Sequence, residues 1–112
     1  MKETKIYIGL NDAETKKQRH ETERYIEILK TVCHNYHVAF SFSVAQGGYF
    51  HADGQYTQEQ SLILSLIDAE NGTVNEIAKD LCMFFHQESV LITEGAVRAY
   101  FISEQLQQPD CD

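Results

Sequence analysis

The chain has 112 residues, with nine Lys and Arg against seventeen Asp and Glu, which gives a formal net charge of −8. This length is typical of one domain, because a core of this size buries roughly two-thirds of the surface of the unfolded chain without a disulfide or a metal. The apolar content of 43% and the single proline exclude a disordered or fibrous chain. The acidic excess excludes a general binder of long nucleic acids, whose affinity comes from clustered Lys and Arg.

The basic residues are concentrated at the start of the chain. Residues 1–36 hold seven basic and six acidic residues, whereas residues 37–112 hold two basic and eleven acidic residues. The two later basic residues are Lys79 and Arg98. A small anionic ligand therefore remains possible, and Arg98 is its most obvious charged partner in the second segment.

The three cysteines indicate neither a disulfide framework nor a metal site. Cys33, Cys82 and Cys111 are odd in number, and none forms a C-x-x-C pair. We therefore expect no metal, no cofactor and a reducing compartment.

The first two elements are predicted from a change in hydrophobic period. Residues 5–10 are β-branched and aromatic and end at Asn11-Asp12, which is typical of a strand leaving into a loop. Residues 14–36 are predicted to form one long amphipathic helix. Its apolar stripe recurs at helical spacing and comprises Tyr25, Ile28, Leu29, Val32 and Tyr36.

Two strands joined by a turn are expected next. Apolar and small or polar residues alternate over residues 38–44, the pattern of a strand with one buried face. Gly47 and Gly48 are expected to interrupt this strand as a bulge or bend, because adjacent glycines permit unusual backbone angles. A turn at residues 51–54 then leads into an apolar strand over residues 60–68.

The last elements are a helix and two strands. The helix is predicted to begin at Thr73, with Glu76 completing a capping box. Residues 88–94 and 96–103 are predicted to form two strands joined at Gly95. We expect one domain over residues 1–104 and a flexible, glutamine-rich tail over residues 105–112.

The resulting order, β-α-β-β-α-β-β, indicates the α+β class. A ferredoxin-like split β-α-β sandwich, with an antiparallel sheet and two helices on one face, accommodates this order with right-handed crossovers. The other face of the sheet is then left for a second copy of the chain, a ligand or solvent.

Three short motifs resemble those of a family of small bacterial and phage proteins described as a domain of unknown function. They are Gly54-Gln55-Tyr56, Glu59-Gln60-Ser61 and Phe85-His86-Gln87-Glu88-Ser89-Val90-Leu91. The last fits the family pattern F-x-Q-E-S-V-L and is the most specific, whereas Tyr56 stands where the family more usually has tryptophan. The N-terminal region is also shorter and more polar than is usual in the family. The resemblance covers roughly residues 5–103. It implies a ferredoxin-like fold and no particular activity.

The last motif permits a catalytic interpretation. Gln87, Glu88 and Ser89 stand where the second helix gives way to a strand, a position that suits either a site or a turn held by side-chain hydrogen bonds. Ser89 has no histidine or cysteine at a spacing that marks a nucleophile. If the protein is an enzyme, His86 and Glu88 are the predicted acid–base pair. The five histidines form no metal-binding motif.

A ligand-binding surface is the alternative interpretation. The backbone N–H groups of a glycine loop, with aromatic and amide side chains nearby, are suited to stack on and read a flat base or sugar. Arg98 and Tyr100 are two residues apart on a predicted strand and therefore share a face. The predicted ligand-binding residues are Gly47, Gly48, Tyr49, Gln55, Tyr56, Arg98 and Tyr100, with Arg24 contributed by the basic helix.

Three hypotheses of function follow. The first is a non-catalytic homo-oligomer that binds a small anionic or nucleotide-like molecule, of the type by which phage proteins sequester a nucleotide-derived immune signal. The second is a cofactor-free enzyme with the His86 and Glu88 pair at a subunit interface. The third is an acidic inhibitor that docks on a basic protein. All three expect no long nucleic acid and no membrane, and a cytoplasmic location, which is the host cytoplasm if a phage encodes the protein.

Overall fold

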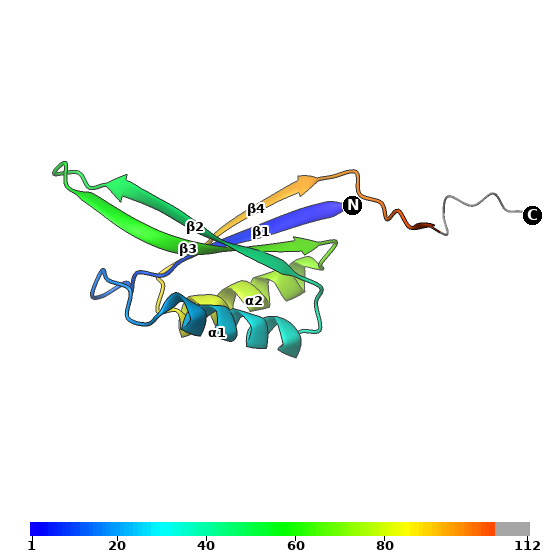
Figure 1. The fold of residues 1–112 in the computed structure, drawn as a ribbon, viewed down its shortest axis with the longest axis horizontal. Helices are drawn as coiled ribbons and strands as arrows, with labels where there is room; N and C mark the ends of the chain where they lie inside the picture. The colour runs from blue at the N-terminus through cyan, green and yellow to red at the C-terminus, as the bar shows by residue number, and fades with distance from the viewer. Residues whose placement is uncertain (105–112) are drawn as a thin grey trace, which may run out of the picture.

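Two helices pack on one face of a four-stranded antiparallel sheet (Figure 1). The computed structural model describes residues 1–104, so the predicted tail over residues 105–112 lies outside the described residues. In chain order the elements are β1 (Lys2–Gly9), α1 (Thr22–Asn35), β2 (Ser41–Phe50), β3 (Tyr56–Ile67), α2 (Asn71–Phe84) and β4 (Leu91–Ala96). The strands lie in the order β2-β3-β1-β4, and each neighbouring pair is antiparallel. The predicted ferredoxin-like α+β fold is confirmed.

The core lies between the helices and the middle of the sheet. The strand side chains that face the helices are completely buried, and they include Ile6 and Ile8 of β1 and Leu62, Leu64 and Leu66 of β3. They pack in one cluster with side chains of both helices, among them Leu29 and Val32 of α1 and Ile77 and Leu81 of α2. Burying one such side chain stabilises a fold by about 1.5–3 kcal/mol, so this layer is the main source of hydrophobic stabilisation.

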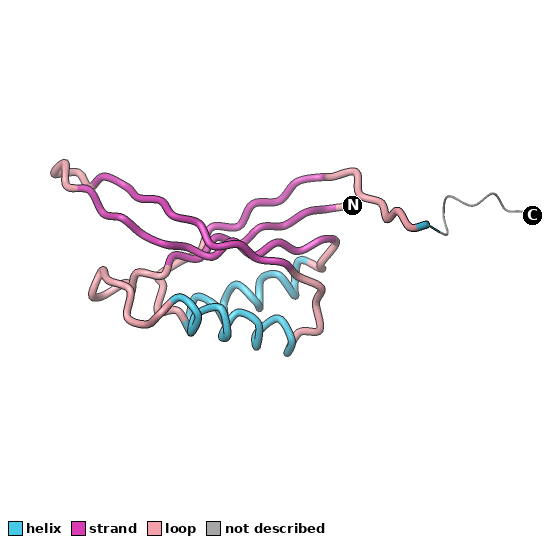
Figure 2. The backbone as a smooth tube through the Cα atoms, viewed as in Figure 1, coloured by secondary structure: helices cyan, strands magenta, loops and turns pink. Residues whose placement is uncertain are grey.

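The β2–β3 hairpin is longer than the rest of the sheet. β3 pairs with β1 only from Ser61 to Ile67, whereas its pairing with β2 continues as far as Tyr56. Residues 45–60, which we call the arm, therefore project beyond the helices as a two-stranded ribbon (Figure 2). Phe50 and Tyr56 stand near its end, 74% and 56% exposed, with their ring centres 5.0 Å apart.

The first helix is shorter than predicted. α1 begins at Thr22 rather than at residue 14. The preceding residues form a loop in which the Asp12 carboxylate accepts two backbone hydrogen bonds. Lys16 has a φ of 64°, which no helical residue adopts. The sequence does not show where the loop ends and the helix begins. The apolar stripe starts only at Tyr25, and the charged residues before it are compatible with both a loop and a helix.

The predicted bulge at Gly47 and Gly48 is absent. β2 passes through both residues and stays in unbroken register with β3 as far as the pair of Phe50 and Tyr56. Gly48 lies beneath the Tyr56 ring, and a Cβ at this position would overlap the Tyr56 hydroxyl. This glycine therefore accommodates a cross-strand ring rather than a bend.

The second helix and the strand after it also differ in their starting points. α2 begins at Asn71, and Glu70 precedes it without a side-chain capping bond. Thr73 lies inside the first turn, so it does not form the predicted capping box with Glu76. β4 begins at Leu91 rather than at residue 88, because the residues before it form a connection that reaches back to the loop after β1.

The strand predicted over residues 96–103 is absent. β4 ends at Ala96, whose partner Lys2 is the first residue of β1. One more backbone hydrogen bond, from the Val97 N–H to the Met1 carbonyl oxygen at 2.8 Å, closes the ladder. Residues 97–103 do not continue the ladder with β1 and leave the sheet as an irregular segment (Figure 1).

Candidate functional site

A polar cavity of about 290 Å³ lies where three segments meet. These segments are the loop after β1, the base of the arm and the connection before β4. The lining residues are Asn11, Asp12, Ala13, Lys16, Tyr49, Glu59, Gln87, Glu88 and Ser89. The volume is close to that of the smallest small-molecule sites. We take this cavity as the candidate functional site because residues of two sequence motifs, Glu59 and 87–89, line it together.

Glu59 of β3 is held in the cavity by the end of β1. Its Oε2 accepts a hydrogen bond from the Asn11 backbone N–H at 3.0 Å. Its carboxylate also lies over Gly9, where the Cβ of any other residue would overlap it. Gly9 is therefore required for this approach, and the Asn11 N–H gives the carboxylate a fixed donor.

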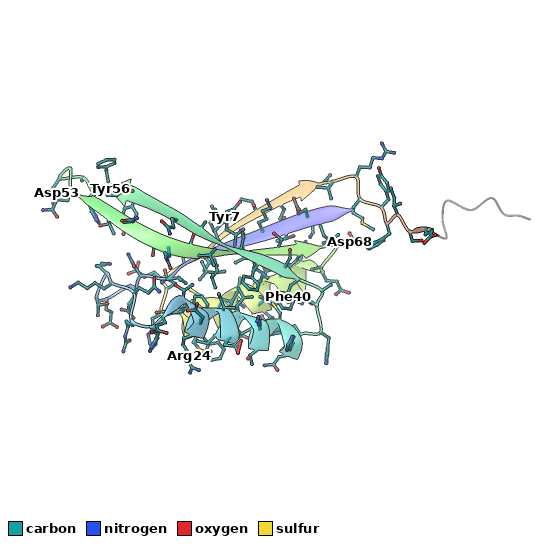
Figure 3. All side chains as sticks on the ribbon, viewed as in Figure 1. Tyr7, Arg24, Phe40, Asp53, Tyr56 and Asp68 are labelled. Atoms are coloured by element: carbon teal, nitrogen blue, oxygen red, sulfur yellow. The ribbon has the colours of Figure 1, made fainter. Side chains whose placement is uncertain are left out.

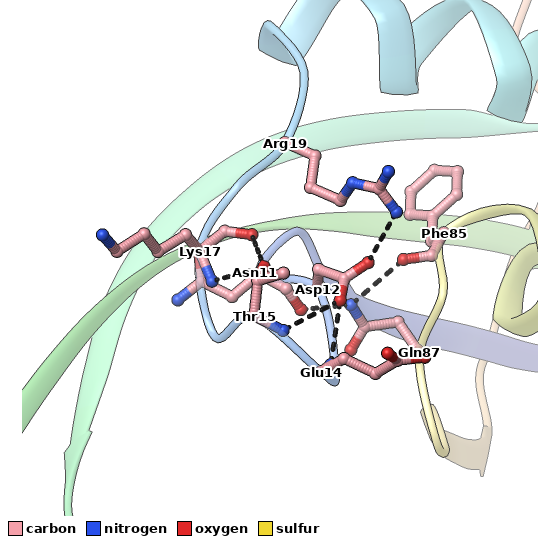
Figure 4. A network of polar contacts seen from close by, with 8 residues as sticks. All are labelled: Asn11, Asp12, Glu14, Thr15, Lys17, Arg19, Phe85 and Gln87. Atoms are coloured by element: carbon pink, nitrogen blue, oxygen red, sulfur yellow. Dashed lines mark hydrogen bonds and ion pairs between the residues drawn. The ribbon is translucent and has the colours of Figure 1, made fainter.

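Asp12 organises the loop that forms one wall (Figure 4). Its side chain is buried, and Oδ1 accepts the backbone N–H groups of Glu14 and Thr15 at 2.8 and 3.1 Å. Oδ2 lies 3.3 Å from Nη1 of Arg19. The two backbone donors, assisted by the guanidinium, hold the pKa of Asp12 below its usual value. Asp12 is thus fully occupied as an anchor of the loop.

Gln87 joins the connection before β4 to the loop after β1. Its Nε2 donates to the Asn11 carbonyl oxygen at 2.6 Å (Figure 4). The Gln87 carbonyl oxygen in turn accepts the Cys82 thiol at 2.9 Å. Asn11 is therefore bonded to Glu59 through its N–H and to Gln87 through its carbonyl, which ties all three walls together. The sequence suggested that side chains of residues 87–89 hold the turn before β4. In the structure Gln87 does so, and not Glu88 or Ser89.

Of the predicted catalytic pair, Glu88 lines the cavity and His86 does not. Glu88 and Ser89 line the cavity with exposed side chains, and within residues 1–104 neither side chain has a hydrogen-bonding partner. His86 is exposed and is not part of the cavity lining. Its backbone carbonyl accepts the Ala13 N–H at 3.0 Å, so His86 contributes to the wall through its main chain.

Of the ligand-binding residues predicted on the arm, Tyr49 alone lines the cavity. It is 44% exposed, and its ring lies 5.0 Å from that of His51. Tyr56 lies near the far end of the arm, close to the turn that contains Asp53 (Figure 3). Gly47, Gly48 and Gln55 likewise belong to the arm or its turn and do not line the cavity.

The three remaining predicted residues lie elsewhere. Arg98 and Tyr100 are in the irregular segment after β4, with the guanidinium 5.4 Å from the centre of the Tyr100 ring. Tyr100 lines a second cavity, of about 520 Å³, beside the sheet face that the helices leave uncovered. Arg24 lies on α1 (Figure 3), beside a third cavity of about 340 Å³ that also contains Phe84. The predicted binding set is thus spread over separate surfaces.

Sequence reasoning did not assign Asn11 and Glu59 to a site. A signal was available, because Glu59 is the first residue of the E-x-S motif that carries the family resemblance. Gln87, Glu88 and Ser89 belong to the F-x-Q-E-S-V-L motif. The cavity is where these two motifs meet.

Two further searches concern metals and membranes. Among the described residues, no group of three or more His, Cys, Asp or Glu side chains is arranged to hold a metal ion. None of the helices in the same residues is long and apolar enough to cross a membrane.

Solved structures with the same fold include a phage SAM lyase. In its complex with S-methyl-5'-thioadenosine this lyase has a TM-score of 0.64 and 23% identity, covering 84% of this chain and 79% of its own. In the apo state the lyase has a TM-score of 0.65 and 25% identity, and the match covers 84% of this chain and 78% of the lyase chain. CutA from Archaeoglobus fulgidus has a TM-score of 0.55 and 11% identity, covering 88% and 87%. The B. subtilis GlnK–ATP complex has a TM-score of 0.52 and 16% identity, and the match covers 85% of this chain and 84% of the GlnK chain.

The sequence comparisons define the family. Among curated proteins, none matches this chain. A family model with the description "Protein of unknown function (DUF3574)" matches residues 3–101, which is nearly all of the described chain. The resemblance carried by the three motifs is therefore confirmed, and the chain belongs to the DUF3574 family.

Proposed function

We propose that this protein binds S-adenosylmethionine in the cavity between the arm and the loop after β1, and cleaves its carbon–sulfur bond. The observation that carries the proposal is the charge of the cavity walls, which include Glu59 and Glu88, with Lys16 as the one cation that residues 1–104 contribute to the lining. The sulfonium group of S-adenosylmethionine carries a permanent positive charge, and a concave site with acidic walls attracts cations. The likeness to a phage SAM lyase, with a TM-score of 0.65, supports this ligand class.

The same walls are unfavourable for a phosphate-bearing ligand. Arg24 and Arg98 lie away from the cavity, and Arg19 is already paired with Asp12. A phosphate placed in the cavity would face Glu59 and Glu88, and like charges at close range repel. The charge distribution therefore favours a cationic nucleoside over the anionic ligand of the first sequence hypothesis.

Two side chains have the properties that an adenosyl ligand needs. Tyr49 offers an exposed aromatic ring on which a flat base can stack. Glu59 is half-buried and fixed by the Asn11 N–H, so its negative charge stays in place when the cavity is filled. We assign base stacking to Tyr49 and attraction of the sulfonium to Glu59.

Cleavage of a sulfonium does not require a nucleophile from the protein. When the bond between sulfur and the amino-acid side chain breaks, the electron pair stays on sulfur and the cation becomes the neutral thioether S-methyl-5'-thioadenosine. The departing carbon chain completes its valence by bonding to its own carboxylate oxygen, so the second product is a lactone. Within residues 1–104 neither His nor Cys lines the cavity, which suits a reaction that depends on binding and orientation.

The test is to incubate the purified protein with S-adenosylmethionine and to measure S-methyl-5'-thioadenosine by mass spectrometry over time. We expect product well above the rate without protein, and a loss of about tenfold or more in Glu59→Gln. Glu76→Gln is the matched control, because Glu76 is an exposed glutamate on α2 that contacts only Lys79 among the described side chains. If the wild-type protein neither binds S-adenosylmethionine in a calorimetric titration nor forms product, the proposal is wrong.

Sequestration without cleavage is the second candidate function. The observation that favours it is that Glu88 and Ser89 line the cavity with exposed side chains that have no hydrogen-bonding partner within residues 1–104, so both can hydrogen-bond an intact ligand. In this case the protein would release intact ligand on heating and form no thioether product. The same incubation therefore separates the two candidates.

We also propose that the protein self-associates. Phe50 at the end of the arm and Phe101 after β4 are 74% and 87% exposed, and the helices cover only one face of the sheet (Figure 1). Exposed apolar surface of this kind is typical of interfaces. Analytical ultracentrifugation should give an oligomer for the wild-type protein and a weaker one for Phe50→Ser. A wild-type monomer at high micromolar concentration would contradict this proposal.

A further inference from the structure

Lys16 is the sole cationic side chain that the described part of the chain, residues 1–104, contributes to the lining of the cavity. Its backbone is held by Asp12, whose carbonyl oxygen accepts the Lys16 N–H at 2.8 Å. The turn gives Lys16 a φ of 64°, an uncommon conformation for a residue with a side chain. The buried Asp12 carboxylate stabilises this turn through the backbone N–H groups that follow it. The position of the ammonium group is thus set by the loop.

The Lys16 ammonium group is available for a ligand. Its Nζ donates to the Ala13 carbonyl oxygen at 2.6 Å, and an ammonium has two further N–H donors. Lys16 takes part in none of the four ion pairs found in residues 1–104. Glu59 and Glu88 line the same cavity without neutralising it.

We propose that Lys16 binds the α-carboxylate of the ligand, so that this cavity selects sulfonium nucleosides that carry a complete amino acid. This inference rests on the proposed function and narrows its substrate class. S-adenosylmethionine has two positive groups, the sulfonium and the α-ammonium, and one negative group, the α-carboxylate. The charged lining groups that form no ion pair have the opposite signs. They are two carboxylates, of Glu59 and Glu88, and one ammonium group, of Lys16.

Removal of the ligand carboxylate reverses the effect of Lys16. Decarboxylated S-adenosylmethionine keeps both positive groups, so Lys16 would repel it without any compensating contact. S-methyl-5'-thioadenosine has no charge for Lys16 to bind. A lysine at this position therefore favours the substrate over both the decarboxylated analogue and the product.

The experiment compares S-adenosylmethionine with its decarboxylated analogue on four proteins. These are the wild type, Lys16→Asn, Lys16→Arg and Lys17→Asn. Asn removes the charge and tolerates a positive φ, and Arg keeps the charge. Lys17 is an exposed neighbour that does not line the cavity and serves as the matched control. The readout is the ratio of Kd for the two ligands, because the decarboxylated analogue lacks the carboxylate that forms the new bond during cleavage.

We expect Lys16→Asn to shift this ratio about three- to fivefold toward the decarboxylated ligand, the size of effect that exposed ion pairs have. Lys16→Arg and Lys17→Asn should keep the wild-type ratio. If Lys16→Asn weakens both ligands equally, Lys16 acts only on the loop structure and the inference is wrong, while the proposed function stands. If the wild-type protein binds neither ligand, the proposed function itself fails.

Discussion

The two halves of β3 share one strand conformation but have opposite surroundings. Residues 61–67 pair with β1, residues 61–65 pair also with β2, and Leu64 and its neighbours lie beneath the helices. Residues 56–60 pair with β2 alone and leave Tyr56 exposed. Glu59 lies near the boundary, beside Gly9 at the end of β1. The difference indicates that stability and the proposed ligand binding belong to adjacent halves of one strand and can be changed separately.

The largest expected effect is on the buried half. Leu64→Ala should destabilise the protein by about 2–5 kcal/mol, because it opens a cavity in a completely buried layer. Gln58→Ala in the outer half of β3 should change the free energy of unfolding by less than about 0.5 kcal/mol, since this side chain is exposed. Urea unfolding measures both variants. Equal costs would contradict the division of β3.

Two glycine substitutions test the boundary between the two halves of β3. Gly9→Ala should displace the Glu59 carboxylate from its bond with the Asn11 N–H, and so weaken S-adenosylmethionine binding several-fold while costing only about 1 kcal/mol of stability. Gly47→Ala is the matched control, because Gly47 pairs with Glu59 across the sheet and has open space at its Cβ position. Calorimetric titration should show normal binding in the control. Normal binding in both variants would mean that Glu59 does not depend on β1 for its position.

The loop after β1 should show an acid dependence of stability. The pKa of Asp12 is lowered in the folded state by the N–H groups of Thr15 and Glu14 and by Arg19. Its stabilising effect is therefore complete above the unfolded value of about 4 and is lost as the pH falls through the lower folded value. The wild type should be more stable than Asp12→Asn at pH 7, and this difference should shrink below pH 4. A difference that stays constant from pH 7 to pH 3 in urea titrations would argue against the charged role of Asp12.

The smallest effect concerns reactivity rather than stability. Cys33 is completely buried in the core, and burial raises its pKa to about 11. Because the thiolate is the reactive form, Cys33 should be alkylated at pH 8 far more slowly in the folded protein than in urea. Peptide mapping by mass spectrometry follows the Cys33 peptide directly. Rapid labelling without denaturant would indicate that the helix layer opens readily.

The fold was predictable because its main elements have clear periods. Alternation in the strands and the helical spacing from Tyr25 onward were enough to indicate a ferredoxin-like arrangement. The errors arose where the local pattern had no partner in the structure. Residues 97–103 contain strand-like side chains but lie beyond the end of β1. The loop before α1 is held by one buried carboxylate, Asp12, which the helical pattern does not reveal.

The candidate site was less predictable because it is assembled from distant segments. The side chains of Glu59 and Gln87 meet by hydrogen-bonding to the backbone of Asn11. No spacing in the sequence indicates such bonds. Arg98 was predicted as a ligand-binding residue because it is a rare basic residue in an acidic segment. The structure places it on an irregular segment next to Tyr100, away from the cavity.

The central claim is that the ligand binds at the acidic cavity rather than beside Arg98. The most direct measurement is a calorimetric titration of S-adenosylmethionine into the wild type, Glu59→Gln and Arg98→Glu, with each variant shown to be folded by circular dichroism. We expect affinity to fall about tenfold in Glu59→Gln and to remain within twofold of the wild type in Arg98→Glu. The opposite pattern, with binding lost in Arg98→Glu and kept in Glu59→Gln, would contradict the account.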